Sequence, residues 1–296
     1  MVIGVNIRAA RILYRMWAGL LLHSLFVVVV NFALDYLAID LSLSGVISMI
    51  GIVLSILMGF RISSAYDRWW EARKIWGDVV NTSRSFAGQL IAFTHQSGLP
   101  RKHLESVIYR QIAIVYAMGY SLRQQRYTDI IKPFLAEDEH RQLIGKQNLP
   151  NLLLLHNLYA VKLLEKDGQL TNFEMLRLSD MISHLTASFG ASERIKNTPF
   201  PLPYSYFTSI LVHLFALMVP FGMAELALLT VPVSIAVIFI FLAIEQIAIE
   251  IQDPFANREN DIPVIALSKI IEIDLKEMLG DVVLPSRRQP RDGILM

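Results

Sequence analysis

An unbroken run of eighteen residues without an ionisable side chain, Leu43 to Phe60, most constrains what this chain can fold into. A helix of about 20 predominantly apolar residues is long enough to cross the hydrocarbon core of a bilayer. Three further segments have similar length and polarity: Met16 to Leu37, Tyr204 to Ala224 and Val231 to Ile249. The sequence therefore predicts four transmembrane helices, paired into two hairpins by the short connections AIDLS and ELALLT.

The composition indicates that the remainder of the chain lies in water. Hydrophobic residues make up 54% of the chain and charged residues 18%, whereas about a quarter of an average soluble domain is charged. The net charge of +1 provides no basic field for binding nucleic acid. The chain has no cysteine, which excludes disulfides, thiolate metal sites and cysteine nucleophiles.

Basic residues predict the orientation in the membrane. Those near the spans gather beside the same four helix ends, and they are Arg8, Arg11, Arg15, Arg61, Arg68, Arg73, Lys74, Arg194, Lys196 and Arg258. The two hairpin connections contain neither lysine nor arginine. The positive-inside rule then places both termini and the long middle segment in the cytoplasm, with the spans in the inner (plasma) membrane. The alternative, that the first span is a cleaved signal peptide, is disfavoured because its apolar region is too long and no A-x-A site follows.

The middle of the chain has helical spacing of apolar residues and no convincing strand alternation. Thr171 and Glu174 have the spacing of a capping box at the start of one such helix. Pro199, Pro201 and Pro203 interrupt the helical pattern before the third span. We therefore expect an all-α membrane protein divided into residues 1–66 with the first hairpin, a cytosolic helical region at 67–203, a second hairpin at 204–250 and a cytosolic segment at 251–296.

No catalytic constellation, phosphate-binding loop or histidine pair with metal-ligand spacing is present, so neither an enzyme nor a resident metal or cofactor is predicted. His23, His213 and Glu245 fall within spans, where a polar group is either functional or hydrogen-bonded to a neighbouring helix. The segment EIQDPFANREND offers oxygen ligands for a hard cation, but its spacing does not match an EF-hand. A solvated helix end is the preferred interpretation of that segment.

The second span carries two stripes at helical spacing. Gly51, Ser55 and Gly59 form a small-residue stripe that permits close helix approach. The adjacent stripe is purely apolar and consists of Ile52, Ile56 and Phe60. In a monomer the apolar stripe would face lipid, whereas in a ring of copies it could line a central axis as hydrophobic collars that gate by dewetting.

Three blocks of sequence resemble the bestrophin family of channels. GFRISSAYDRWWEARKIWG follows the second span, SERIKNTPFPLPYSY precedes the third, and EIQDPFANRENDIP follows the fourth. Tryptophans beside arginine at a helix end are also typical of an interfacial belt. The residues that carry the resemblance are Arg68, Trp69, Trp70, Trp76, Asp253, Pro254 and Phe255.

This resemblance implies a homopentamer around one axial pore, with Ile52, Ile56 and Phe60 as its hydrophobic neck. A second, cytosolic constriction would correspond to Leu170, and the tryptophan block would pack the cytosolic domain against the neck. Animal members carry an unbroken acidic run after D-P-F that contributes to a calcium clasp. Here Arg258 interrupts the acids, so calcium activation is expected to be absent or weak.

The permeant ion is predicted from the outer acids. Asp35, Asp40 and Glu225 lie near the outer hairpins, and five copies would concentrate cations there. Bacterial relatives resemble cation-preferring channels and animal members conduct chloride, so we expect monovalent cations such as Na⁺, with an anion channel of the same architecture as the alternative. A carrier or a membrane-anchored scaffold is the rival class. The expected partners are copies of the same chain, the lipid bilayer and permeant monovalent ions, and no nucleic acid.

Overall fold

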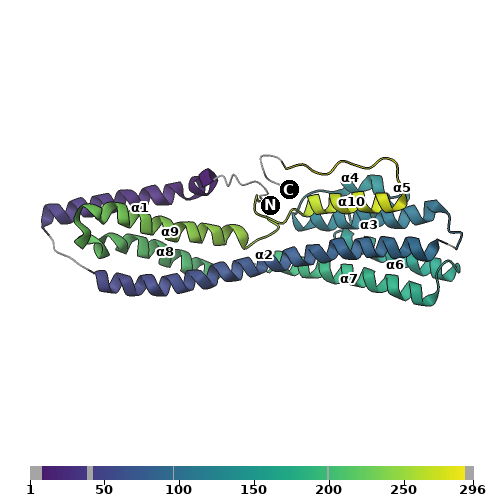
Figure 1. The fold of residues 1–296 in the computed structure, drawn as a ribbon, viewed down its shortest axis with the longest axis horizontal. Helices are drawn as coiled ribbons and strands as arrows, with labels where there is room; N and C mark the ends of the chain where they lie inside the picture. The colour runs from purple at the N-terminus through teal and green to yellow at the C-terminus, as the bar shows by residue number, and fades with distance from the viewer. Residues whose placement is uncertain (1–8, 39–42, 96, 199, 291–296) are drawn as a thin grey trace. The chain divides into compact units, whose positions relative to one another are not determined.

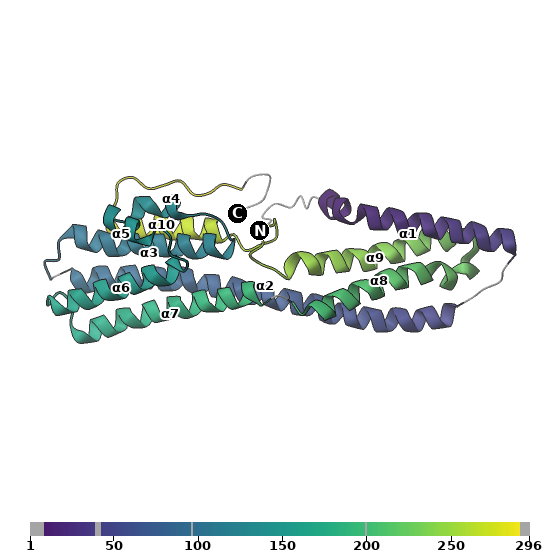
Figure 2. The ribbon, with the colours of Figure 1, turned by 180° about the vertical axis from the view of Figure 1, so that it is seen from behind.

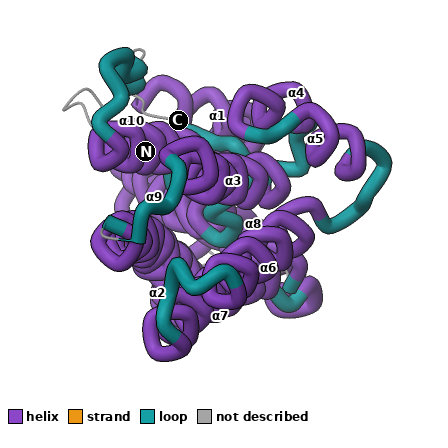
Figure 3. Tube along the Cα trace, turned by 90° about the vertical axis from the view of Figure 1, so that its right-hand side faces the viewer, coloured by secondary structure: helices purple, strands orange, loops and turns teal. Residues whose placement is uncertain are grey.

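The computed structural model describes residues 9–38, 43–95, 97–198 and 200–290, and within these ranges it contains helices and loops but no strand (Figure 3). The helices are α1 (Ala9–Leu37), α2 (Ser44–Thr94), α3 (Arg101–Leu122), α4 (Thr128–Ile131), η1 (Lys132–Phe134), α5 (Glu137–Leu143), α6 (Leu149–Lys166), α7 (Asn172–Asn197), α8 (Leu202–Gly222), η2 (Ala224–Leu229), α9 (Thr230–Ile251) and α10 (Val264–Leu279). The prediction of an all-α protein is confirmed for these residues.

The described residues form two compact units. The first, called the apolar unit, lies within Val5–Trp69 and Pro199–Asp253, and the second, called the polar unit, lies within Trp70–Thr198 and Pro254–Met296. Helix α2 contributes to both units, because it continues without a break from the second apolar segment through the tryptophan block. The chain passes from one unit to the other after Trp69, Thr198 and Asp253, and the domain boundaries expected from the sequence after residues 66, 203 and 250 stay a prediction.

The apolar unit contains the four helices that are long and apolar enough to cross a membrane: α1, the first part of α2, α8 and η2–α9 (Figure 1). Helix α1 packs along α9 and α8, and α8 packs along α9. Their shared core is apolar, and Val27, Val212 and Val219 are completely buried in it. Two of the prolines before the third apolar segment lie at the start of α8. Pro201 is its N-cap and Pro203 lies in its first turn, where the N–H of any residue has no acceptor within the helix, so proline costs no hydrogen bond there.

The polar unit is a helical bundle in which α3 is the central element. Every residue from Gln111 to Gly119 is buried, because α3 contacts α6, α7 and α10 as well as the short helices α4 and η1 (Figures 1 and 2). A helix covered on all sides is expected to be apolar around its whole circumference, as this stretch largely is. The predicted capping box at the start of α7 is confirmed, since Thr171 Oγ1 accepts from the Glu174 N–H at 3.3 Å and Glu174 accepts from the Thr171 N–H at 2.7 Å.

Gly119 allows α3 to approach its neighbours closely. A Cβ at this position would lie 3.2 Å from Ile265 Cδ1 and 3.4 Å from the indole of Trp76. Trp76 comes from α2 and is 1% exposed, so its indole fills the core of the polar unit. Helices α2, α3 and α10 therefore meet at one tightly packed point.

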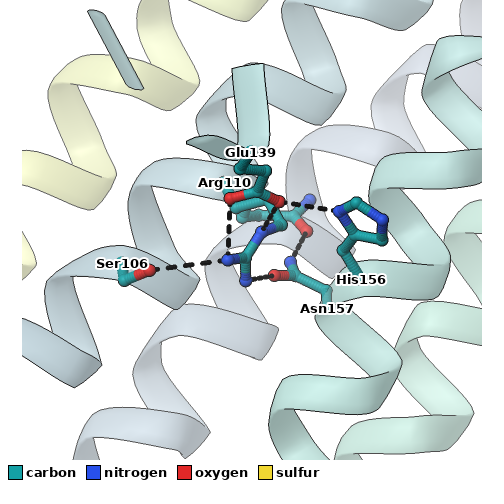
Figure 4. A network of polar contacts seen from close by, with 6 residues as sticks. Ser106, Arg110, Glu139, His156 and Asn157 are labelled. Carbon is teal, nitrogen blue, oxygen red and sulfur yellow. Dashed lines mark hydrogen bonds and ion pairs between the residues drawn. The ribbon is translucent and has the colours of Figure 1, made fainter. Parts of the chain in front are cut away.

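A polar network ties the short helix α5 to the bundle (Figure 4). Arg110 on α3 donates to both carboxylate oxygens of Glu139, at 2.5 and 2.9 Å, and to Asn157 Oδ1 at 3.1 Å. His156 Nδ1 lies 2.8 Å from the same carboxylate, and Asn157 donates onward to Gln111 at 3.4 Å. The bidentate arginine–carboxylate geometry is the strong form of this contact and fixes where α5 docks.

The network predicts a specific response to acid. Burial raises the pKa of Glu139, but the hydrogen bond and charge of Arg110, together with those of His156, outweigh burial and leave the pKa below its ordinary value. A carboxyl whose pKa is lowered by folding contributes stability above its unfolded pKa and loses it as the pH falls through the folded value. Glu139→Gln should therefore lower the melting temperature at neutral pH and make the loss of stability below about pH 5 shallower. Thermal melts across pH would show this. Glu137→Gln, on the same helix but with a 59% exposed side chain, should leave both unchanged.

Candidate functional site

The apolar stripe of α2 lies on the side of the helix that its own chain leaves uncovered. The stripe consists of Ile52, Ile56 and Phe60. These side chains are 56–65% exposed, whereas Ile47, Leu54 and Met58 from the same segment are 1–3% exposed. At 3.6 residues per turn the two sets lie on roughly opposite faces of the helix. The buried face packs into the apolar unit, so the stripe is available for contact with lipid or with other chains.

The small-residue stripe has one close contact within the chain. A Cβ at Gly51 would lie 3.3 Å from the ring of Phe215, so glycine lets α2 approach α8 there. Gly59 has open space around its missing Cβ. Ser55 donates to the Gly51 carbonyl at 2.7 Å, which satisfies its hydroxyl inside the apolar segment. The predicted close helix approach thus occurs at Gly51.

Arginines on α1 and α2 bind the last turns of α9. Arg61 Nη1 lies 3.4 Å from Glu245 Oε1, with side chains only 3% and 6% exposed. Seven residues later, Arg68 donates to the carbonyl of Gln252 at 3.0 Å, and Arg15 on α1 pairs with Glu250 at 2.9 Å. From the sequence, Arg61 and Arg68 mark the cytoplasmic edge of the membrane, Arg68 also belongs to the family motif, and Glu245 has no assigned role. A lone acid in one apolar segment and an arginine directly after another were the signal that the two pair.

The two histidines within the spans meet each other. His23 Nε2 on α1 lies 2.9 Å from His213 Nδ1 on α8, and the rings are stacked with centroids 5.2 Å apart. The sequence left two roles open for these histidines, a functional role or a hydrogen bond to a neighbouring helix. The structure contains that hydrogen bond. His23 is 4% exposed, so the contact joins α1 to α8 inside the apolar unit.

The tryptophan block divides between the two units. Trp69 stacks on Tyr66 one turn earlier, with ring centroids 6.1 Å apart, and Trp70 is 46% exposed. Trp76 is instead a core residue of the polar unit rather than an exposed anchor at a membrane surface. The three indoles therefore lie in three different environments, although they are close in sequence.

The D-P-F element begins a loop whose two ends are joined by a hydrogen bond. Pro254 and Phe255 are buried, and the Ile262 N–H donates to the Pro254 carbonyl at 3.1 Å, which joins the two ends of the loop. Inside it, the Asp261 carboxylate accepts from the Arg258 N–H at 2.9 Å. Asp253, which precedes the loop, belongs to the apolar unit. Among the residues that the structure describes, no three His, Cys, Asp or Glu side chains are grouped so that they could hold a metal ion.

The remaining predicted residues are scattered. Asp35 is exposed in the last turn of α1 and accepts from Asn31 at 3.3 Å, Glu225 is exposed in η2, and Asp40 lies outside the described residues. Leu170, the predicted cytosolic constriction, is 5% exposed in the connection between α6 and α7, so its own chain covers it. Phe173, three residues later, is 85% exposed and was not singled out by the sequence.

Comparison with known proteins identifies the family. The profile of the bacterial/fungal bestrophin proteins matches residues 5–277. The voltage-dependent anion channel-forming protein YneE of Escherichia coli K12 is 29% identical over 283 residues, covering 94% of this chain and 91% of that protein. A protein of the same description from Ralstonia nicotianae is 31% identical over 254 residues, covering 84% and 81%. A crystal structure of a bacterial bestrophin homologue from Klebsiella pneumoniae superposes with a TM-score of 0.81 at 28% identity, covering 88% of this chain and 97% of that one. On these findings, the chain belongs to the bacterial/fungal bestrophin family.

Proposed function

We propose that this chain assembles as a homopentamer in the inner (plasma) membrane and conducts monovalent ions along the shared axis, with anions preferred. The observation that carries the proposal is the exposed stripe of Ile52, Ile56 and Phe60, on the face of α2 opposite its packed face. In a ring of copies this stripe forms stacked apolar collars. A narrow apolar collar gates conduction by excluding water until it widens.

Lipid contact is the competing role for the stripe, and family membership argues against it. Bestrophin relatives of similar length are named as channel-forming proteins, and a channel needs a surface around which copies can close. The absence of lysine and arginine from the hairpin connections supports cytoplasmic termini by the positive-inside rule.

The sign of the permeant ion is proposed from the relatives' names. They are called anion channel-forming proteins, and the collars of the neck carry no charge that would reject an anion. This revises the cation preference expected from the sequence. Cations remain the second candidate because Asp35 and Glu225 are both exposed at the hairpin ends of their helices, where five copies would attract cations.

The test is reconstitution of the purified protein in planar bilayers with a sodium chloride gradient, alongside its native mass in detergent. We expect a mass of five chains and a reversal potential displaced toward the chloride equilibrium potential. A reversal potential displaced toward sodium would keep the channel and select the second candidate. A monomeric or dimeric mass without current would favour the scaffold or carrier class and contradict the proposal.

A further inference from the structure

Helix α8 contacts the first part of α2 at two glycines. Within the apolar unit, α8 lies between α9 and this part of α2 (Figures 1 and 2). A Cβ added to Gly222, the last residue of α8, would lie 3.0 Å from three side-chain atoms of Ile47 on α2. A Cβ added to Gly51 on α2 would lie 3.3 Å from Cζ of the Phe215 ring on α8. We call these two contacts the α8 seat, and at both of them glycine allows the helices to approach this closely.

The side chains that face the two glycines are held in place. Ile47 is 2% exposed, and its branched Cβ restricts it to few rotamers. Phe215 is 4% exposed, and its ring packs edge-on against Phe241 of α9 with centroids 4.8 Å apart. Neither side chain can therefore turn away from an added methyl group, so the helices themselves would have to separate.

Of the two helices, α2 is the one that would move. Helix α8 packs along both α1 and α9, and its residues Val212 and Val219 are completely buried among them. A close-packed core has few voids into which α8 could shift. The first part of α2, in contrast, has a whole face that its own chain leaves uncovered, the apolar stripe.

The α8 seat lies on the opposite side of α2 from the apolar stripe. Ile47 and Ile56 are nine residues apart in sequence, and so are Gly51 and Phe60. Nine residues make two and a half turns at 3.6 residues per turn, so the two members of each pair point in opposite directions from the helix. A displacement of α2 away from α8 therefore carries Ile56 and Phe60 in the direction in which they point.

We infer that the α8 seat sets the width of the neck, so that Gly51 and Gly222 are positioning residues for conduction although neither belongs to the stripe. This inference rests on the proposed function, in which the stripes of all copies face one axis. Separation of α2 from α8 then moves every stripe toward the axis and narrows the collars, whereas a closer approach widens them. A narrower apolar collar excludes water more strongly, which raises the barrier to ions.

Adding a methyl group at the seat should lower the single-channel conductance. Gly51→Ala and Gly222→Ala should each reduce it by up to about tenfold, the change in rate that about 1.4 kcal/mol on the barrier produces. Gly19→Ala is the matched control, because Gly19 lies within α1 of the same unit and a Cβ there would meet open space. It makes the same change in helix propensity as the other two substitutions, so its conductance should equal that of the wild type.

A substitution on α8 separates positioning from a loss of stability. The atoms nearest to an added Cβ at Gly51 are Cζ and Cε2 of Phe215, and leucine has neither. Phe215→Leu should therefore raise the conductance on its own and return the Gly51→Ala channel to about the wild-type value. The same substitution leaves a cavity in the core and should lower the melting temperature. A merely structural role of Phe215 would lower the conductance as well.

The conductances are compared between assemblies of the same native mass. If Gly51→Ala and Gly222→Ala conduct like the wild type while Ile56→Ala conducts more, the neck stands and the seat does not position it. An equal fall in Gly19→Ala, or a Phe215→Leu channel that conducts no more than the wild type, also overturns the inference. If the two seat variants do not assemble, the conductance of Phe215→Leu alone decides. A wild-type protein that passes no current refutes the proposed function, and the inference with it.

Discussion

An Ile56→Ala channel is expected to pass more current than the wild-type channel at the same voltage. Ile56 is the middle residue of the apolar stripe, so in the proposed channel its truncation would remove apolar atoms from the centre of the neck in every copy. A wider, less apolar collar holds water more readily, which lowers the barrier to conduction. A barrier lower by about 1.4 kcal/mol would raise the current about tenfold. Because the side chain is 56% exposed in its own chain, assembly and folding should be little affected.

Leu25→Ala is the matched control for this experiment. Leucine and isoleucine lose the same number of carbon atoms on truncation to alanine, and Leu25 is 61% exposed on α1 in the same apolar unit. Its truncation should leave the current unchanged, because Leu25 lies on α1 and is not part of the proposed neck. Equal currents from the wild type and Ile56→Ala, or an equal increase in both variants, would show that the stripe is not the neck.

Removal of the Glu245 carboxylate should cause the largest loss of stability of any single charge in the apolar unit. Glu245→Ala leaves the Arg61 guanidinium buried at 3% exposure without its counter-charge. Breaking one partner of a buried pair costs about 3–5 kcal/mol, because the remaining ion stays out of water. The measurement is the thermal melt of the purified protein in lipid nanodiscs, read as the midpoint relative to wild type.

Two further variants test whether that loss of stability comes from the unpaired buried charge of Arg61. Glu71→Ala removes an exposed partner of Arg194, whose pair at 3.3 Å should contribute no more than about 1 kcal/mol. Combining Arg61→Met with Glu245→Leu removes both charges, so most of the stability should return. If Glu245→Ala melts no earlier than Glu71→Ala, the buried pair does not hold α2 against α9.

The elements that could be predicted from the sequence are those whose signal is local. Four apolar runs, the capping box at Thr171 and Glu174, and the prolines before α8 each follow from neighbouring residues, and each is found in the structure. The length of α2, in contrast, has no such local signal, because the apolar residues end at Phe60 whereas the helix continues to Thr94. Hydropathy changes where the surroundings of a helix change, whereas the backbone hydrogen bonds that define the helix do not depend on that change.

The parts of the candidate site that could not be predicted depend on contacts between residues distant in sequence. Arg61 and Glu245 are 184 residues apart, and no spacing rule relates them. Trp76 has the same local context as Trp69 and Trp70, yet it is buried because α3 offers a glycine opposite it. Leu170 is 5% exposed in the connection between α6 and α7, and its burial depends on the packing of these two helices, which no local pattern predicts.

The continuity of α2 imposes a rule on how its length can vary. Each inserted or deleted residue turns everything beyond it by about 100°, so one insertion between Ile52 and Ile56 would carry Ile56 and Phe60 off the face that they share with Ile52. Insertion of about seven residues would restore the direction to within about 20° and about eighteen would restore it fully, each lengthening the helix by about 1.5 Å per residue. The apolar stripe of α2 can therefore exchange residues one for one, but the helix can gain or lose them within the stripe only in nearly whole turns.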